Sequence, residues 1–434
     1  MAAAEQLFIS ILIILVSARV LGELFQRAKL PPLVGELLAG VIIGPSLLGV
    51  VLPAPDFEVL SSLAVFFMMF LAGLEMDSRQ LRKAGKSALI VSIVAFLLPL
   101  FSGYYVSQFF GLSEIQSWFM ALLLSITAVP VSAIVMMQLG VLNTRLGNTV
   151  MAAAVINDIM SLIVLSILLQ AAADGFGEAV GQPLNVDFIQ LTIFAAGIAI
   201  FLGEIFLLDI LFTSTRTIGW LPEKIEPFFR ALRTREASFA VVLITTITMS
   251  LVAQTIGLHF IIGTFFAGLV VYKQIIGKGN FNRVYGVISA ITFGFFGPIF
   301  FGIIGISFNV QTLANSIPFF LSLLGVAVAA KIGGGFIGAR IAGFSKETSM
   351  ALGSLMNGRG MVELAIASIG YAAGIIDAQL FSVAVAIGFV TTVIAPLSSR
   401  PLLAIAKRRG SADVMPDPGI EHSSAPTDPL QDGK

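Results

Sequence analysis

The sequence predicts an all-α integral membrane protein with about thirteen membrane-spanning helices, and three observations lead to this prediction. Of the 434 residues, 57% are hydrophobic and only 12% are charged, whereas about a quarter of the residues are charged in a typical soluble domain. Apolar runs of about 20 residues, the length that crosses a hydrocarbon core of about 30 Å, recur along the whole chain. Most of the basic residues, finally, lie in alternate connections between these runs or in the C-terminal tail.

The apolar runs follow one another with short connections, in the manner of a polytopic membrane protein. The first run has no cationic leader or cleavage pattern before it, so we expect it to be retained as a span. Residues 406–434 are rich in Pro, Ser, Asp and Gly and are predicted to be a disordered cytoplasmic tail. The thirteen runs lie near residues 6–25, 33–52, 58–75, 87–110, 116–140, 145–171, 187–212, 237–256, 258–273, 286–307, 316–342, 348–371 and 378–405.

Charge placement tests this assignment independently of hydropathy. Of the 25 Lys and Arg residues, 22 follow odd-numbered runs or lie in the tail, and the connections after even-numbered runs contain none. By the positive-inside rule the odd connections are cytoplasmic, which predicts an N-terminus outside and a C-terminus in the cytoplasm. One span more or fewer would break the alternation. A bacterial-type inner membrane or an internal membrane is the expected location.

Composition also narrows the function. The formal net charge is zero, and no basic domain is available to hold a nucleic acid. The chain has no cysteine, which excludes disulfides, thiolate catalysis and cysteine metal sites. Neither the HExxH pattern of zinc proteases nor an aspartate-rich prenyl-transfer motif is present. The sequence therefore argues against a membrane-embedded enzyme, and no cofactor is expected.

Two small-residue ladders suggest an internal repeat. Gly35–Gly40 and Gly263–Gly268 have the same spacing of glycines, and they lie 228 positions apart. Inverted repeats are a common way for transporters to build a central site. We therefore expect two inverted six-helix repeats, at about 6–171 and 237–405, with a linker helix at 187–212. The alternative is that each ladder is an ordinary helix-packing seam.

Two predicted spans contain helix breaks at the same offset. Pro130 interrupts one span and Gly358 and Gly360 interrupt the other, with Pro130 and Gly358 again 228 residues apart. A proline inside a helix removes an amide donor and leaves carbonyls that need a partner in lipid. These breaks predict two crossed discontinuous helices whose ends face each other at the midplane, where carbonyls can bind a cation and helix N-termini can attract a carboxylate. A tolerated proline kink is the alternative.

Three basic residues lie inside predicted spans instead of between them. Arg19 lies near the end of its span, and Glu23, one turn later, is its expected partner. Lys331 is near the middle of another span, and Arg359 and Glu363 lie one turn apart beyond the second break. Lys331, Arg359 and Glu363 are predicted to support the central site.

Asp158 is the strongest candidate for that site. It occupies the middle of the 145–171 span, where a charge costs about 2.5 to 3.5 kcal/mol and therefore needs a partner or a use. The deprotonated carboxylate can bind Na⁺ or K⁺ together with oxygens of Thr127 and Ser132, while the protonated form cannot. This competition predicts exchange of a cation for a proton. A permanent structural pair with Lys331 is the alternative.

Several segments together resemble the sodium/hydrogen exchanger superfamily, and most nearly its bacterial Kef/NapA-type monovalent cation:proton antiporters. The resemblance covers about residues 6–405. It implies an ion-carrying core domain that moves against a dimerisation domain, usually in a homodimer. It also implies that Asp158 is the essential carboxylate, Thr127 the threonine of the crossing and Lys331 the core lysine. The segments are 30–40, 44–46, 72–77, 157–158, 263–269 and 358–364.

The sequence departs from part of the family at the residue before Asp158. Electrogenic members carry two adjacent aspartates, whereas this chain has Asn157, as electroneutral members do. We therefore expect Asn157 to be a neutral ligand or a partner that positions Asp158, and we expect the exchange to be electroneutral, although Lys331 is typical of electrogenic relatives. No nucleotide-binding domain of the Kef type follows residue 405, so gating of that kind is not expected.

The expected function is antiport of Na⁺, with K⁺ or Li⁺ as further candidates, against H⁺ in pH and salt homeostasis. The expected partners are the two ions, the lipid bilayer and a second copy of the chain. A K⁺/H⁺ antiporter of the Kef type, a cation-coupled solute symporter of similar fold and a passive channel are the alternatives. Residue spacing does not rank Na⁺ against K⁺, because selectivity depends on cavity size and ligand rigidity.

Overall fold

The computed structural model describes residues 3–28, 30–75, 78–127, 129–142, 144–173, 236–255, 259–270 and 278–414. The elements in these residues are helices, and eight of them are long and apolar enough to cross a membrane. The all-helical membrane fold is therefore confirmed. The predicted linker span at 187–212 lies outside the described residues, and the count of thirteen spans stays a prediction.

The helices before residue 174 and those after residue 235 match one another in order. Each helix up to residue 173 has a counterpart about 228 residues later: α10 for α1, α11 for α2, α13 to α14 for α3, and α16 to α19 for α4 to α7. The first set is α1 (Ala3–Arg27), α2 (Pro32–Ile43), α3 (Asp56–Glu75), α4 (Ser78–Phe109), α5 (Glu114–Ser125), α6 (Val129–Gln138) and α7 (Arg145–Ala173). The second set is α10 (Ala237–Thr255), α11 (Phe260–Val270), α13 (Lys278–Ile291), η1 (Thr292–Phe296), α14 (Gly297–Ser307), α15 (Val310–Asn315), α16 (Ile317–Ile341), α17 (Lys346–Met356), α18 (Met361–Ala372), α19 (Ala378–Arg408) and η2 (Ala412–Val414).

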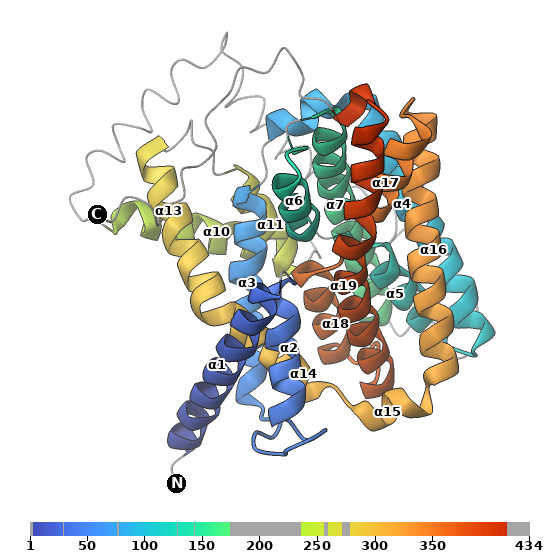
Figure 1. Ribbon diagram of the computed structural model, residues 1–434. Coiled ribbons are helices and arrows are strands. Elements are labelled where there is room, and N and C mark those ends of the chain that lie inside the picture. Colours follow the sequence, from blue (N-terminus) through green and yellow to red (C-terminus); the bar gives the residue numbers. More distant parts are fainter. Residues whose placement is uncertain are drawn as a thin grey trace.

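The helices form two groups that lie side by side (Figure 1). One group contains α1 to α3, α10, α11, α13 and α14, and the other contains α4 to α7 and α16 to α19. In the first group α2 packs against α14 and α11 packs against α3, so the second helix of each set packs against the third helix of the other set. The broken helices belong to the second group.

The two glycine ladders lie at equivalent helix contacts. A Cβ atom at Gly40 would lie 2.0 Å from the carbonyl oxygen of Gly302, and one at Gly268 would lie 2.4 Å from that of Phe70. Only glycine allows backbones to approach so closely, which is how small residues act in membrane helix pairs. The ladders are therefore packing seams, and they are seams at matching positions of the two sets of helices.

Some helix limits differ from the predicted ones. The second helix ends at Ile43, well before residue 52, because the chain turns to an extended conformation at Gly44 (φ −76°, ψ −179°) just before Pro45. The helix predicted to begin near 286 begins at Lys278 and includes the π-helical turn η1. Hydropathy alone misses both limits, because apolar loop residues and polar helical residues blur the boundary of a span.

The predicted partner of Arg19 is wrong. Glu23 instead pairs with Arg27, at 3.0 Å between Nε and Oε1. Arg19 extends to α2, where its Nη1 lies 3.8 Å from Oε1 of the buried Glu36, and it donates a hydrogen bond to the carbonyl of Phe293 in η1. A π-helical turn does not follow the regular hydrogen-bond pattern of an α-helix, and a long guanidinium can satisfy such a carbonyl. The tertiary contact replaces the local pair.

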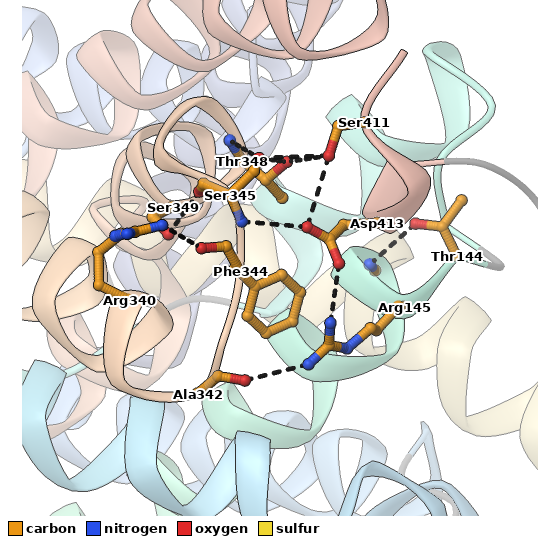
Figure 2. A network of polar contacts seen from close by, with 11 residues as sticks. Thr144, Arg145, Arg340, Ala342, Phe344, Ser345, Thr348, Ser349, Ser411 and Asp413 are labelled. Atoms are coloured by element: carbon orange, nitrogen blue, oxygen red, sulfur yellow. Dashed lines mark hydrogen bonds and ion pairs between the residues drawn. The ribbon is translucent and has the colours of Figure 1, made fainter. Parts of the chain in front are cut away.

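The segment after α19 folds back onto two other helices (Figure 2). Asp413 in η2 accepts hydrogen bonds from Arg145 Nη1 at 2.9 Å and from the Ser345 amide at 3.2 Å. Arg145 also donates to the Ala342 carbonyl at 3.0 Å and stacks on the ring of Phe344 at 4.2 Å. Ordered structure therefore continues to Val414, beyond the predicted boundary at 405. The remainder of the predicted tail, 415–434, lies outside the described residues.

Replacing Asp413 with alanine is expected to lower the free energy of unfolding by about 1 to 2 kcal/mol. The variant loses the partly exposed hydrogen bond from Arg145 and leaves the Ser345 amide without its carboxylate acceptor. Thermal denaturation of the detergent-purified protein measures the change. Asp413→Asn keeps the shape and one acceptor, so about half of the loss is expected. Equal stability of D413A and the parent protein would contradict a bracing role for this segment.

Candidate functional site

Two discontinuous helices cross at the centre of the second group. The first break follows Ser125 and separates α5 from α6, and the second, at Asn357–Gly360, separates α17 from α18. Pro130 is the second residue of α6, where a missing amide costs the helix nothing. Gly358 and Gly360 lie in the second break. Both broken half-helices α5 and α17 begin with a serine N-cap, Ser113 and Ser345.

Two contacts hold the breaks against each other. The Ser132 hydroxyl of α6 donates to the Leu355 carbonyl at 2.6 Å, and Arg359 donates through Nη2 to the Leu124 carbonyl at 2.8 Å. The first contact joins the start of α6 to the end of α17, and the second joins the end of α5 to the second break. Ser132, predicted as a cation ligand, therefore has a linking contact that sequence reasoning missed.

The carboxyl end of α5 is neutralised by two buried cations. A helix leaves its last four carbonyls without an intrahelical partner and carries partial negative charge there. Arg359 donates to the carbonyls of Leu123 and Leu124, and Lys331 of α16 donates to that of Ser125. The sequence predicted that carbonyls at the helix breaks bind the transported cation. At the end of α5 these carbonyls are instead bound by the side chains of Arg359 and Lys331.

Lys331 and Asp158 do not form the structural ion pair that was the alternative interpretation of these two residues. The Lys331 ammonium group also donates to the Ala95 carbonyl of α4 at 3.1 Å. No ion pair within 4.0 Å joins Lys331 to Asp158, and both residues lie in the described part of the chain. The alternative of a permanent Asp158–Lys331 pair therefore has no support from the geometry.

Asp158 and Asn157 lie in the middle of α7, beside the first break. Asp158 is 3% exposed and Asn157 is fully buried. Asn157 donates through Nδ2 to the Thr127 hydroxyl at 3.1 Å, which brings three of the predicted site residues together. Within the described part of the chain, the Oδ1 atoms of Asn157 and Asp158 have no hydrogen-bond partner. Two unpartnered oxygens in a buried site are the kind of ligand that a dehydrated monovalent cation requires.

Arg359 and Glu363 form the ion pair that their spacing predicted. Arg359 Nη1 lies 2.8 Å from Glu363 Oε1, and the two side chains are 0% and 1% exposed. The second oxygen, Oε2, has no hydrogen-bond partner, and a Cβ atom at Gly388 of α19 would lie 3.4 Å from it. The guanidinium serves both Glu363 and the end of α5, so the pair connects α18 to α5.

One polar residue of the crossing was missed by the sequence reasoning. Asn357, the C-cap residue of α17, is fully buried, and neither Oδ1 nor Nδ2 of its side chain has a hydrogen-bond partner among the described residues. Leaving buried polar groups unpaired costs about 1 to 3 kcal/mol each. Its position directly before Gly358 was the available signal, because it is the first residue of the second break.

A cavity of about 1440 Å³ opens on the side of the molecule where α7 ends. Its lining includes Leu169 of α7 but not Asp158, which lies three turns earlier in the same helix. His259, immediately before α11, also lines the cavity. Burial lowers the pKa of His259 to about 4, so the imidazole stays neutral near pH 7.

Comparison with known proteins identifies the family. The model of the family described as "Sodium/hydrogen exchanger, transmembrane" matches residues 11–405. This chain belongs to the sodium/hydrogen exchanger family. The match covers both sets of helices and both breaks.

Two antiporters align with this exchanger-family chain along nearly their whole length. A Na⁺/H⁺ antiporter of Enterococcus hirae is 29% identical over 90% of this chain and 96% of its own. The Na⁺/H⁺-K⁺ antiporter GerN of Bacillus cereus is 31% identical over 90% of this chain and 95% of its own. The relatives are transporters, which agrees with the expectation that the chain is not an enzyme.

A solved structure supports the fold. The sodium proton antiporter MjNhaP1 from Methanocaldococcus jannaschii at pH 8 superposes with a TM-score of 0.65, at 17% identity, and the match covers 92% of this chain and 98% of that chain. The structural match confirms the antiporter-type fold, and the family model confirms the superfamily resemblance. The Kef/NapA branch stays a prediction.

Proposed function

We propose that this chain is a secondary active antiporter that exchanges a monovalent cation for H⁺, with Na⁺ as the first candidate and K⁺ or Li⁺ as further ones. The observation that carries the proposal is the buried Asp158 carboxyl, whose Oδ1 has no hydrogen-bond partner and which lies beside Asn157 and the first helix break. The relatives described as Na⁺/H⁺ and Na⁺/H⁺-K⁺ antiporters agree with this choice of ions.

Competition at Asp158 couples the two ions. The deprotonated carboxylate binds the cation together with oxygens of Asn157 and Thr127, and a proton on the carboxyl abolishes this binding. A buried carboxylate with neither ion is an uncompensated charge, which is costly in a medium of low polarity. A carrier that holds neither ion therefore rarely changes its orientation in the membrane. Because both ions use the same carboxyl, one must be released before the other can bind and be carried across.

Movement of the second helix group against the first supplies alternating access in this proposal. The cavity beside the end of α7 stops short of Asp158, so a rearrangement is needed to bring the site into contact with it. The predicted topology places this cavity on the outer side. A homodimer, held by the group that does not carry the ion, completes the proposed assembly.

A one-for-one, electroneutral exchange is the expected stoichiometry. Asn157 leaves one carboxylate in this part of α7, and Lys331 is engaged by the carbonyls of Ala95 and Ser125. The ammonium therefore contributes to the packing around the site and takes no part in the exchange. Arg359 and Glu363 neutralise each other and likewise take no part in the exchange.

Proteoliposomes with an internal pH dye test both the ions and the stoichiometry. Adding Na⁺ to vesicles that hold a proton gradient is expected to dissipate it, and clamping the membrane potential at zero or at about 100 mV, which would bias each net charge moved by about 2.3 kcal/mol, should leave the rate unchanged. A voltage-dependent rate would contradict electroneutral exchange. A response to K⁺ without Na⁺ would favour the Kef-type alternative, and no response to any alkali cation would refute antiport.

A further inference from the structure

The unpaired amide of Asn357 is unexplained by the fold. The side chain is fully buried, and in the described part of the chain its oxygen and nitrogen both lack hydrogen-bond partners. The backbone N–H of Asn357 is already satisfied, because it donates to the carbonyls at the end of α17. An apolar side chain would fill the same space without leaving polar atoms unpaired. The carboxamide therefore points to a ligand.

The contacts between the breaks place Asn357 at the centre of the crossing. Two residues before it, the Leu355 carbonyl is bound by Ser132, and two residues after it, Arg359 is bound to the Leu124 carbonyl. On the other broken helix, Thr127 lies between the same two partners, Leu124 and Ser132. The middle of one break therefore faces the middle of the other.

The same centre holds the predicted ion site. Thr127 is bound by Asn157 at 3.1 Å, and Asp158 is the next residue of α7. The unpartnered atoms of this region include three oxygens, Oδ1 of Asn157, Asp158 and Asn357. Rotation about the terminal torsion of Asn357, which has a broad energy profile, can turn its carboxamide oxygen toward an ion. Neutral amide and carboxylate oxygens are the ligands that alkali cations prefer.

We propose that Asn357 supplies an oxygen ligand to the transported cation, so that the ion site is built from both broken helices together with α7. The proposal rests on the antiport function proposed above. It assigns each break a ligand, Thr127 in the first and Asn357 in the second. A cation of this site then binds to both crossed helices at once, and its release loosens a contact between them.

Kinetics of Asn357→Ala test the proposal in proteoliposomes at fixed pH. The loss of one ligand is expected to raise the KM for Na⁺ at least ten-fold while the maximal rate falls less than three-fold. Ser107→Ala is the matched control, since its hydroxyl is also buried and without a partner but lies on α4, and its KM should equal that of the parent. An unchanged KM in a folded N357A protein would overturn the proposal, as would an equal rise in the control.

The isosteric Asn357→Asp covers the case in which the alanine variant does not fold. A second carboxylate in the ion site is expected to lower the dissociation constant for Na⁺ at least three-fold at pH 9, measured by cation-dependent thermal stabilisation of the purified protein. An unchanged constant would show that residue 357 does not contact the cation. If Asn357 held only a structural water, its variants would lose stability while their Na⁺ constants stayed those of the parent, and the proposal would fall.

The two proposals fail in different ways. If the parent protein shows no cation-dependent proton flux, antiport itself is refuted. If the parent exchanges Na⁺ for H⁺ and depends on Asp158, but the Asn357 variants bind and transport Na⁺ as the parent does, the assignment of Asn357 alone is refuted.

Discussion

Replacing Asp158 with asparagine is expected to reduce cation/proton exchange at least 100-fold. The amide has the size of a protonated carboxyl, so the buried position 3% exposed to solvent remains filled and the fold is retained. It carries no negative charge, however, and cannot exchange a proton for a cation. Dye quenching in proteoliposomes with Na⁺, K⁺ and Li⁺ measures the loss.

The control for this variant is Asp56→Asn. Asp56 is an exposed carboxylate in the first turn of α3, and the variant is expected to exchange ions at the parent rate. Stabilisation of the purified protein by Na⁺ should also disappear in D158N and persist in D56N. More than a tenth of the parent activity in a folded D158N protein would show that another group carries the proton.

Replacing Arg359 with alanine is expected to destabilise the protein by about 3 to 5 kcal/mol, the usual result of removing one partner of a buried ion pair. The variant leaves Glu363 as an unpaired buried charge and frees the carbonyls of Leu123 and Leu124. Size-exclusion profiles and thermal denaturation in detergent measure the effect.

A double-mutant cycle separates the two roles of Arg359. Glu363→Gln removes the charge that Arg359 pairs with, so Arg359→Ala should cost less in that background than in the parent. The cost that remains reports the unpaired carbonyls at the end of α5. An Arg359→Ala protein as stable as the parent would mean that neither contact stabilises the crossing, contrary to what the buried geometry implies.

The helical part of the fold is largely accessible from sequence. Apolar runs locate the described spans because the hydrocarbon core imposes a length on every helix that crosses it. The two breaks are also visible, since Pro130 and the pair Gly358 and Gly360 are poor helix residues in otherwise apolar spans. Helix ends are less accessible, as α2 and α13 demonstrate, because lipid exposure and loop burial both favour apolar residues.

Some of the site residues can be predicted from sequence, and the partners of others cannot. Asp158 stands out from sequence because a charge in the middle of a span is costly, and the Arg359–Glu363 pair follows from helical spacing. The partners of Arg19 and Lys331 do not follow. Arg19 pairs across helices with Glu36 instead of locally with Glu23, and Lys331 binds the carbonyls of Ala95 and Ser125. Long basic side chains reach many groups, so spacing does not choose among them.

Composition and spacing alone therefore establish a membrane-embedded helical chain with two broken helices and one central carboxylate, because the cost of polar groups in lipid acts on each residue wherever the chain folds. The tertiary structure decides which buried groups satisfy one another. Lys331 and Arg359 neutralise the end of α5, and Ser132 joins the two breaks. After these contacts are made, Asp158, Asn157 and Asn357 still have unpartnered oxygens. Which buried oxygens stay unpartnered depends on the neighbours of each residue in three dimensions, and no local pattern in the sequence specifies them.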